Sequence, residues 1–487
     1  MASCSEPSMT TVNTPKAGNP AALELQDVSN YLAQPTLDSP SQNSSRDSLT
    51  DSQTPAHAVS ALPRWNESRS NIFKTLSTFV GFLVMGANDA VYGAIIPYLQ
   101  PYYGISYTVV SLVFLSPMVG YVSAAALNNT LHKTVGQRGV AIVGPGAHLL
   151  AYIIISVHPP YPALVCVFVL AGFGNGVLDA AWNAWLGNLA NPNEILGFLH
   201  GFYGVGATIA PTIATTMITQ RGWGWYTFYY IMIGGALVEL LTATSAFWQE
   251  SGARFRATIS AEAASGATRA ALKTRVAWVS AVFLLCYVGI EVSLGGWIVN
   301  FMIEIRKGQK FESGLVATGF WLGITMGRVI LGFVTPRIGE HVSIVLYLLL
   351  ASAMQITLWL VPSFAISSVA VALVGFLLGP LFPAVVVATT KLLPAHLHVA
   401  TIGFAAAFGG SGACVLPFGV GAVAQATGLW SLQPIILAML IFSCFLWAFG
   451  IPNIAKTGGE ATAAERKVGK AKQEVKRMFY GCFAARL

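Results

Sequence analysis

The run ALVCVFVLAGFGNGVLDAAWNAWL, residues 163–186, decides the kind of fold that this chain adopts. As a helix it is long enough to cross the ~30 Å hydrocarbon core of a bilayer, yet it contains a carboxylate, Asp179. A charged side chain at that depth costs about 2.5–3.5 kcal/mol on insertion scales. Such a side chain is expected where its helix faces a wet interior instead of lipid. The run therefore predicts a membrane-spanning helix that lines a polar space.

The composition of the whole chain extends this prediction. The 487 residues are 54% hydrophobic and only 10% charged, whereas soluble domains carry about 25% charged residues. A large soluble enzyme is therefore excluded, and a multi-pass all-α membrane protein is expected. The cysteines lie in apolar segments or in the tails, without metal-site spacing. We expect no metal, no cofactor and no nucleic-acid partner, and we interpret the net charge of +7 as a sign of membrane topology.

Apolar segments of spanning length follow one another along the chain. We predict twelve spans, near 75–98, 108–127, 140–157, 163–186, 197–218, 226–248, 276–300, 313–335, 341–361, 364–390, 398–426 and 430–450. The predicted organisation is a disordered tail (1–71), a six-helix bundle (72–248), a linker (249–275), a second six-helix bundle (276–452) and a basic tail (453–487). The first sixty residues contain 23 Ser, Thr or Pro and no signal-peptide segment.

The basic residues of the connections predict the orientation. With both termini in the cytoplasm, twenty Lys and Arg of the loops and C-terminal tail fall on the cytoplasmic side, and four fall on the other side. We therefore expect both termini to be cytoplasmic, most simply in the plasma membrane, with the vacuole or another internal membrane as the alternative.

The two halves of the chain repeat each other. The fifth span reads GFLHGFYGVGATIAP from Gly197, and the eleventh reads GFAAAFGGSGACVLP from Gly403. The first span carries an acid and then a glycine, Asp89 and Gly93, and the seventh carries Glu291 and Gly295 in the same order. A six-helix unit duplicated in the same orientation is typical of parallel-repeat transporters, and glycines four residues apart allow helices to pack closely.

With these features the chain resembles the major facilitator superfamily over all twelve spans. The signature of that family between spans two and three, Gly-x-x-x-Asp-Arg-x-Gly-Arg, is reduced here. The first copy keeps Gly136 and Arg138 but has Lys133 at the Asp position. The second copy keeps Gly332, Arg337 and Gly339 with Pro336 in place of Asp.

The fourth and fifth spans resemble one branch of that family, the fucose-permease-like transporters, and their combination resembles fungal members. GVLDAAWN, residues 176–183, is similar to the Gly-x-Leu-acid-x-Ala-x-Asn pattern of this branch, and HGFYGVGATIAP, residues 200–211, is similar to its fifth span. The resemblance implies that Asp179 couples protonation to transport. The acid of span one in this branch would align with Gly93, but this chain has Asp89 one turn earlier.

Five ionisable residues lie well inside the spans, and three of them are on spans that line the central cavity in the superfamily. These three acids, Asp89, Asp179 and Glu291, are the predicted proton-coupling residues, because a buried carboxyl can take up a proton from one side and release it to the other. The predicted substrate-binding residues are Asn175, Asn183, His200, Asn88, Trp182 and Arg328. Asn175 and Asn183 lie one turn on either side of Asp179 and share its helix face.

Each of these residues has a structural alternative. Arg328 can neutralise a carboxylate, His200 and Trp182 can pack between helices, and an intramembrane acid can bond to a neighbouring helix. For Glu239 on span six, and for His148 on span three, the structural role is favoured.

The resulting hypothesis is a secondary active transporter, proton-coupled and working by alternating access, for a small organic solute such as a sugar or a secondary metabolite. It would act as a monomer with the solute, protons and the lipid bilayer as partners. A non-transporting nutrient sensor on the same fold and an uncoupled facilitator are the alternatives. No nucleotide-binding loop and no catalytic constellation occurs in the sequence, so we do not expect an enzyme.

Overall fold

The computed structural model describes residues 63–190, 192–258 and 270–457, and the regular elements in these ranges are all helices. Their bounds are α1 Arg69–Tyr103, α2 Tyr107–Val110, α3 Leu112–Ser156, α4 Tyr161–Gly187, α5 Pro192–Thr219, η3 Trp225–Thr227, α6 Phe228–Ala246, α7 Gly252–Thr258, α9 Arg275–Glu304, α10 Lys310–Ile338, α11 Glu340–Leu360, α12 Phe364–Leu378, α13 Leu381–Leu392, α14 Ala395–Thr427, η4 Leu429–Ser431 and α15 Leu432–Thr457. Residues 1–62 and 458–487 of the predicted tails and residues 259–269 of the predicted linker lie outside the described residues. The predicted N-terminal tail ends earlier than expected, because α1 begins at Arg69.

The membrane crossings follow from these helices. By length and hydropathy, ten helical stretches of the described chain can cross a membrane. One of them, Tyr107–Ser156, is 50 residues long and turns at Gly136, so it makes two crossings. α5 is not among the ten, but it is 28 residues long and packs on α1 as α14 packs on α9. With α3 counted twice and α5 added, the described residues provide helices for the twelve crossings that the sequence predicts.

The second and third crossings meet without a loop. The sequence predicted a polar connection over 128–139, but the helix α3 continues through it and changes direction at Gly136, where φ is 71° and ψ is −168°. A β-carbon at this glycine would lie 2.4 Å from the carbonyl oxygen of Glu250. Only glycine suits both this left-handed backbone and this contact. The turn therefore rests directly on the segment that follows α6.

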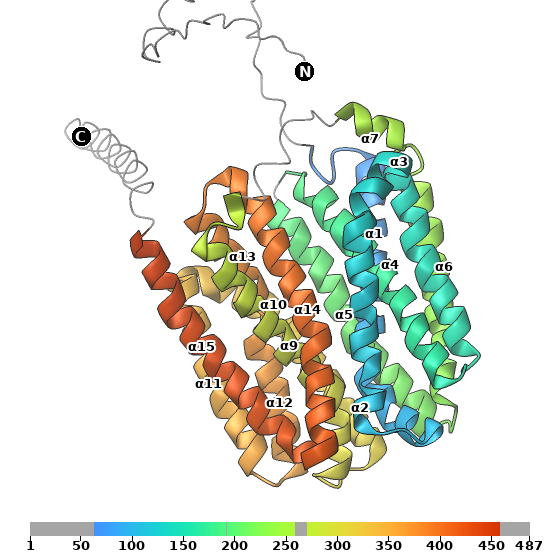
Figure 1. Cartoon of the computed structure of the whole chain (residues 1–487), viewed down its shortest axis with the longest axis vertical. Coiled ribbons are helices and arrows are strands. Elements are labelled where there is room, and N and C mark those ends of the chain that lie inside the picture. The colour runs from blue at the N-terminus through green and yellow to red at the C-terminus, as the bar shows by residue number, and fades with distance from the viewer. Residues whose placement is uncertain (1–62, 191, 259–269, 458–487) are drawn as a thin grey trace, which may run out of the picture. The chain divides into compact units, whose positions relative to one another are not determined.

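The helices fall into two groups that lie beside each other (Figure 1). α1 and α3 to α6 pack among themselves, and α9 to α15 pack among themselves. The groups meet where α5 packs on α10, α1 on α9, and α3 on α14. The first and seventh crossings are the most enclosed, since 78% of the apolar window of each is buried. The acids of α1 and α9 thus belong to the innermost helices.

Equivalent glycines set the helix crossings in the two groups. A β-carbon at Gly206 of α5 would lie 2.0 Å from the carbonyl oxygen of Leu83 on α1, and one at Gly412 of α14 would lie 2.0 Å from that of Leu285 on α9. These two glycines are aligned in the repeated spans. The repeat therefore preserves the close contact of one helix pair in both halves of the chain.

Threonine hydroxyls join the groups along the seam between α5 and α10. The hydroxyl groups of Thr212 and Thr318 are 2.8 Å apart, and those of Thr208 and Thr325 are 3.5 Å apart. A β-carbon at Gly314 would lie 2.2 Å from the hydroxyl of Thr215. The seam is therefore tight and polar, without a salt bridge among the described residues of the two helices.

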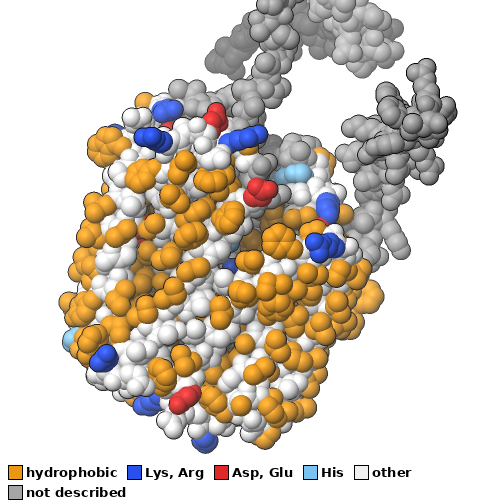
Figure 2. Space-filling view, turned by 180° about the vertical axis from the view of Figure 1, so that it is seen from behind, with side chains coloured by type: hydrophobic (Ala, Val, Ile, Leu, Met, Phe, Trp, Pro, Cys, Tyr) orange, Lys and Arg blue, Asp and Glu red, His pale blue; other side chains and the backbone are white. Residues whose placement is uncertain are grey.

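The outer surface is suited to lipid. Figure 2 shows hydrophobic side chains spread over the middle of the face, while most of the Lys, Arg, Asp and Glu lie towards its two ends. Large apolar side chains such as Leu241, Phe333 and Phe445 are exposed. An apolar belt between polar ends is what a membrane-spanning bundle requires.

Candidate functional site

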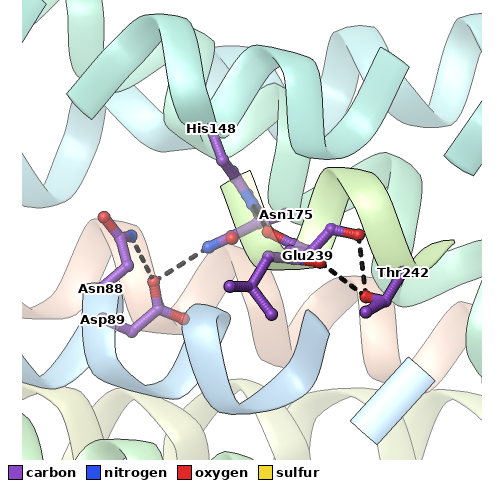
Figure 3. Close-up of polar contacts among 7 residues, drawn as sticks. Asn88, Asp89, His148, Asn175, Glu239 and Thr242 are labelled. Atoms are coloured by element: carbon purple, nitrogen blue, oxygen red, sulfur yellow. Dashed lines mark hydrogen bonds and ion pairs between the residues drawn. The ribbon is translucent and has the colours of Figure 1, made fainter. Parts of the chain in front are cut away.

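Asp89 is held by side chains from three helices. Its Oδ1 accepts hydrogen bonds from Asn88 Nδ2 at 3.0 Å and from Asn175 Nδ2 of α4 at 2.9 Å, as Figure 3 shows. Its Oδ2 accepts a hydrogen bond from the hydroxyl of Tyr203 on α5 at 3.0 Å. Three donors directed at one carboxyl group suit the ionised form. Asn88 Nδ2 also donates to the hydroxyl of Tyr92 at 2.9 Å, which fixes the amide in place.

Asp179 has a simpler environment. Asn183, one turn further along α4, donates from Nδ2 to Asp179 Oδ1 at 2.8 Å and to its backbone carbonyl at 2.9 Å. The face of α4 that carries Asn175, Asp179 and Asn183 therefore serves both acids: its first amide bonds to Asp89 and its last amide bonds to Asp179. Both acids are partly exposed.

Glu291 differs because it has a basic partner. The guanidinium group of Arg328 on α10 donates to Glu291 Oε1 at 3.0 Å, and the two side chains are 18% and 6% exposed. Arg328 has two predicted roles, in solute binding and in neutralising an acid. In the structure its guanidinium group lies beside the carboxylate of Glu291. No Lys or Arg of the described ranges forms an ion pair with Asp89 or Asp179.

The two aromatic candidates lie in different surroundings. His200 of α5 contacts Phe82 of α1 edge-on, with ring centroids 5.4 Å apart, and Phe382 of α13 at 6.0 Å. It is partly exposed and lies at the boundary of the two helix groups. Trp182 is only 1% exposed and stacks on Phe247, with centroids 4.6 Å apart. This placement favours a packing role for Trp182 over contact with a ligand.

Tyr203 completes the shell around Asp89, although it is not among the residues predicted from sequence. Its signal in the sequence is its position three residues after His200, on the same face of the fifth span. Glu239 and His148 carry separate structural predictions, whereas the structure pairs them: His148 Nδ1 is 3.0 Å from Glu239 Oε2. Which helices meet cannot be read from one span alone, and both pairings join helices far apart in sequence.

The reduced signature between crossings two and three makes a different set of contacts. The backbone N–H of Arg138 donates to the carbonyl of Glu250 at 3.0 Å, and its guanidinium lies 5.2 Å from the ring centre of Trp248. Lys133 contributes its carbonyl, which accepts a hydrogen bond from Arg256. The Glu250 carboxylate is 2.5 Å from the ammonium group of Lys74. Backbone and aromatic contacts thus connect α3 to the segment after α6.

A duplicated helical bundle with acids on its inner helices is typical of polytopic membrane transporters. The sequence profile described as Major Facilitator Superfamily matches residues 78–417. The chain therefore belongs to the Major Facilitator Superfamily, as its motifs predict.

Curated relatives agree with this assignment. The chain is 29% identical to Bypass of stop codon protein 6 of Saccharomyces cerevisiae over 390 residues, which cover 73% of this chain and 78% of that protein. It is 21% identical to the Glucose/mannose transporter GlcP of Bacillus subtilis, over 74% of this chain and 89% of that one. It is 23% identical to the Cyanate transport protein CynX of Escherichia coli, over 54% and 66% of the two chains. The yeast relative is consistent with the expected fungal character.

A solved structure supports the same fold. The Major Facilitator Superfamily transporter FucP, crystallised in its outward conformation, superposes with a TM-score of 0.55 at 15% identity, covering 78% of this chain and 98% of FucP.

Proposed function

We propose that this chain is a proton-coupled secondary transporter of a small polar organic solute, in which Asp89 and Asp179 carry the coupling protons. The observation that carries the proposal is the environment of Asp89. Its carboxyl group is partly exposed, receives three hydrogen bonds and has no Lys or Arg partner among the described residues. A carboxyl that lacks a fixed counter-charge can lose its own charge by binding a proton.

Glu291 has a different part in this proposal. Arg328 compensates the negative charge of Glu291 within the protein, so the ionised form of Glu291 is stable without a bound proton. The guanidinium group has five N–H donors, and one of them bonds to Glu291 Oε1. We assign Arg328 to solute binding, with Glu291 holding it in position and contributing to coupling when a solute displaces that contact.

The remaining candidates supply a polar surface around the acids. Asn183 carries a partly exposed amide, and His200 carries a partly exposed ring at the boundary of the helix groups. Asn88 and Asn175 are each 1% exposed, so we assign them to holding Asp89 in position and not to contacting the solute. An amide and a guanidinium can hydrogen-bond several hydroxyl groups, which suits a sugar. The names of the two bacterial relatives, a glucose/mannose transporter and a cyanate transporter, support a small polar solute. The resemblance to the fucose-permease-like branch favours a monosaccharide within that class.

We also propose that the protein is a monomer in the plasma membrane with both termini in the cytoplasm. We propose that its two bundles are the predicted ones, 72–248 and 276–452. The excess of Lys and Arg in the connections on the cytoplasmic side supports the orientation. The separate packing of α1 to α6 and of α9 to α15 supports the two bundles.

Transport by the purified protein in liposomes tests the proposal. We would impose a pH difference across the membrane and measure accumulation of radiolabelled hexoses, pentoses and small organic anions. The wild-type protein should accumulate at least one of these solutes in response to the gradient. Asp89→Asn and Asp179→Asn should each reduce gradient-driven accumulation at least tenfold, because neither amide can bind and release a proton, while solute exchange without a gradient continues.

The control is Glu312→Gln, which removes an exposed acid from the first turn of α10. It should accumulate solute like the wild type. Transport that ignores the gradient would replace the proposal with a facilitator. Solute binding without any transport would replace it with a sensor.

A further inference from the structure

A second buried acid–base pair lies behind the Asp89 site. His148 of α3 and Glu239 of α6 are 0% and 1% exposed in their side chains, and His148 Nδ1 lies 3.0 Å from Glu239 Oε2. Polar groups at this depth are costly unless they are paired or have a function. The fold also makes room for the pair, because a β-carbon at Gly174 of α4 would lie 2.5 Å from Cδ2 and 2.7 Å from Nε2 of the histidine ring.

Asn175 lies between this pair and Asp89 (Figure 3). Its amide nitrogen donates to Asp89 Oδ1 at 2.9 Å, so the amide oxygen is left for the other side, where His148 is a neighbour. Asn175 Oδ1 and His148 Nε2 are both buried, and neither has a hydrogen-bond partner among the described residues. Because the two side chains are neighbours, a proton on Nε2 would give the Asn175 oxygen a donor. That bond would complete a chain of contacts from Glu239 through His148 and Asn175 to Asp89.

We propose that the His148–Glu239 pair is a further proton-carrying site, beside Asp89 and Asp179, and that it is coupled to Asp89 through the amide of Asn175. With a proton on both ring nitrogens, His148 donates Nδ1–H to Glu239 and Nε2–H to Asn175 Oδ1, which fixes the amide N–H on an ionised Asp89. When Asp89 is protonated, its neutral carboxyl group binds the Asn175 N–H more weakly, and the hydrogen bond between His148 Nε2–H and Asn175 Oδ1 is released. The proposal rests on the proposed function for its purpose, but its geometry and its test do not.

Other titratable groups surround these residues and belong to the same electrostatic environment. They are Tyr92, Tyr121, Tyr152, Tyr203, Tyr229, Asp179, Glu291 and Cys414. The ring of Tyr152 stacks on His148 with centroids 5.7 Å apart, which holds the imidazole plane. Among the ion pairs of the described residues, His148 with Glu239 is the most deeply buried, at 0% and 1% exposure against 18% and 6% for Arg328 with Glu291.

The test measures the protonation of Asp89 directly, without a transported solute. Infrared difference spectra of the full-length protein in nanodiscs, recorded against pH, give a protonated-carboxyl band that is assigned to Asp89 by its loss in Asp89→Asn. Coupling predicts that His148→Gln and Glu239→Gln each move the midpoint of this band by about one pH unit or more, a tenfold change in proton affinity. His148→Gln in an Asn175→Leu background should produce no further movement, because the connecting amide is already absent.

The matched control is His132→Gln. This histidine is also on α3, but it contacts the carbonyl of Asn128 and the ring of Phe255. It should leave the Asp89 midpoint unchanged. An unchanged Asp89 midpoint in both His148→Gln and Glu239→Gln would overturn the proposal. The pair would then have only a structural role, in the packing of α3 on α6.

A second measurement, of His148 protonation, tests the coupling if His148→Gln or Glu239→Gln fails to fold or if the Asp89 band does not titrate. Protonation of Asp89 and protonation of His148 affect each other by the same factor, so removing the Asp89 carboxyl group in Asp89→Asn should also change the affinity of His148 for its proton. Nitrogen-15 spectra of labelled histidine would show this as a displaced titration of the His148 signals. Identical His148 titrations in wild type and Asp89→Asn would overturn the coupling. Neither spectrum needs a solute or a gradient, so a failed transport assay and a failed coupling remain separate results.

Discussion

At the residue scale, the acids of the inner helices differ in what neutralises them. Glu291 has Arg328 at 3.0 Å, whereas Asp89 has two amides and a hydroxyl. An amide stabilises a carboxylate without cancelling its charge, and a guanidinium cancels it. The net charge at Asp89 therefore changes whenever a proton binds, and that change is what a membrane gradient or a bound solute can act on.

This difference gives a stability prediction for the ion pair. Breaking a buried pair by removing one partner typically costs about 3–5 kcal/mol, because the other charge is left uncompensated. Since Arg328 is 18% exposed, we expect the lower end of this range for Arg328→Gln. The double variant Arg328→Gln with Glu291→Gln should recover much of the loss. Thermal unfolding in detergent measures both, and equal stability of the single and double variants would contradict the assigned pairing.

At the element scale, the crossing of α1 with α5, and that of α9 with α14, depends on one missing side chain each. The glycines at these crossings face a backbone carbonyl at a distance where no β-carbon fits. Carbonyl groups of a neighbouring helix cannot rotate away, so the helices themselves would have to separate.

We therefore predict that Gly206→Val and Gly412→Val each greatly reduce the yield of folded protein. The measurement is the fraction that elutes as a single species from size-exclusion chromatography after membrane extraction. The matched controls are Gly197→Ala on α5 and Gly410→Ala on α14, where an added β-carbon meets nothing within 4 Å. Equal losses in the controls would show that glycine flexibility matters in these helices and that close packing does not.

The helices themselves were largely predictable from sequence, and the reason is physical. Twelve apolar stretches are visible because lipid tolerates few polar side chains. The break between α12 and α13, at Pro380, falls inside the single predicted span 364–390. The turn at Gly136 was not predictable as such, because it depends on the carbonyl of Glu250, which is far away in sequence. The same holds for the site. Asp89 and Asp179 stand out as charges in an apolar run, but the role of Tyr203 depends on α5 crossing α1 at the level of Asp89.

At the scale of the whole molecule, the seam between α5 and α10 is where the two groups must move if the protein works by alternating access. Its hydroxyl contacts are short-range and uncharged, so they can be exchanged without stranding a buried ion. A seam of this kind therefore allows the two helix groups to rotate against each other at a small cost in free energy.

Cross-linking the seam tests this. Thr212 and Thr318 have hydroxyl oxygens 2.8 Å apart, so cysteines at both positions should form a disulfide on oxidation. We expect oxidation of the double variant to stop net transport and reduction to restore it. Each single cysteine variant serves as the control and should be insensitive to oxidant. Undiminished transport by fully cross-linked protein would mean that the halves do not separate along this seam.

The turn at Gly136 has a consequence for how the protein is made. One residue separates the directions of two crossings in α3, so no slack exists between them. If the connection at Gly136 is already helical, the first of these helices cannot move from the translocon into lipid before the second has left the ribosome. We expect the pair to be inserted together as a hairpin, with a single amino acid deciding where the nascent chain reverses.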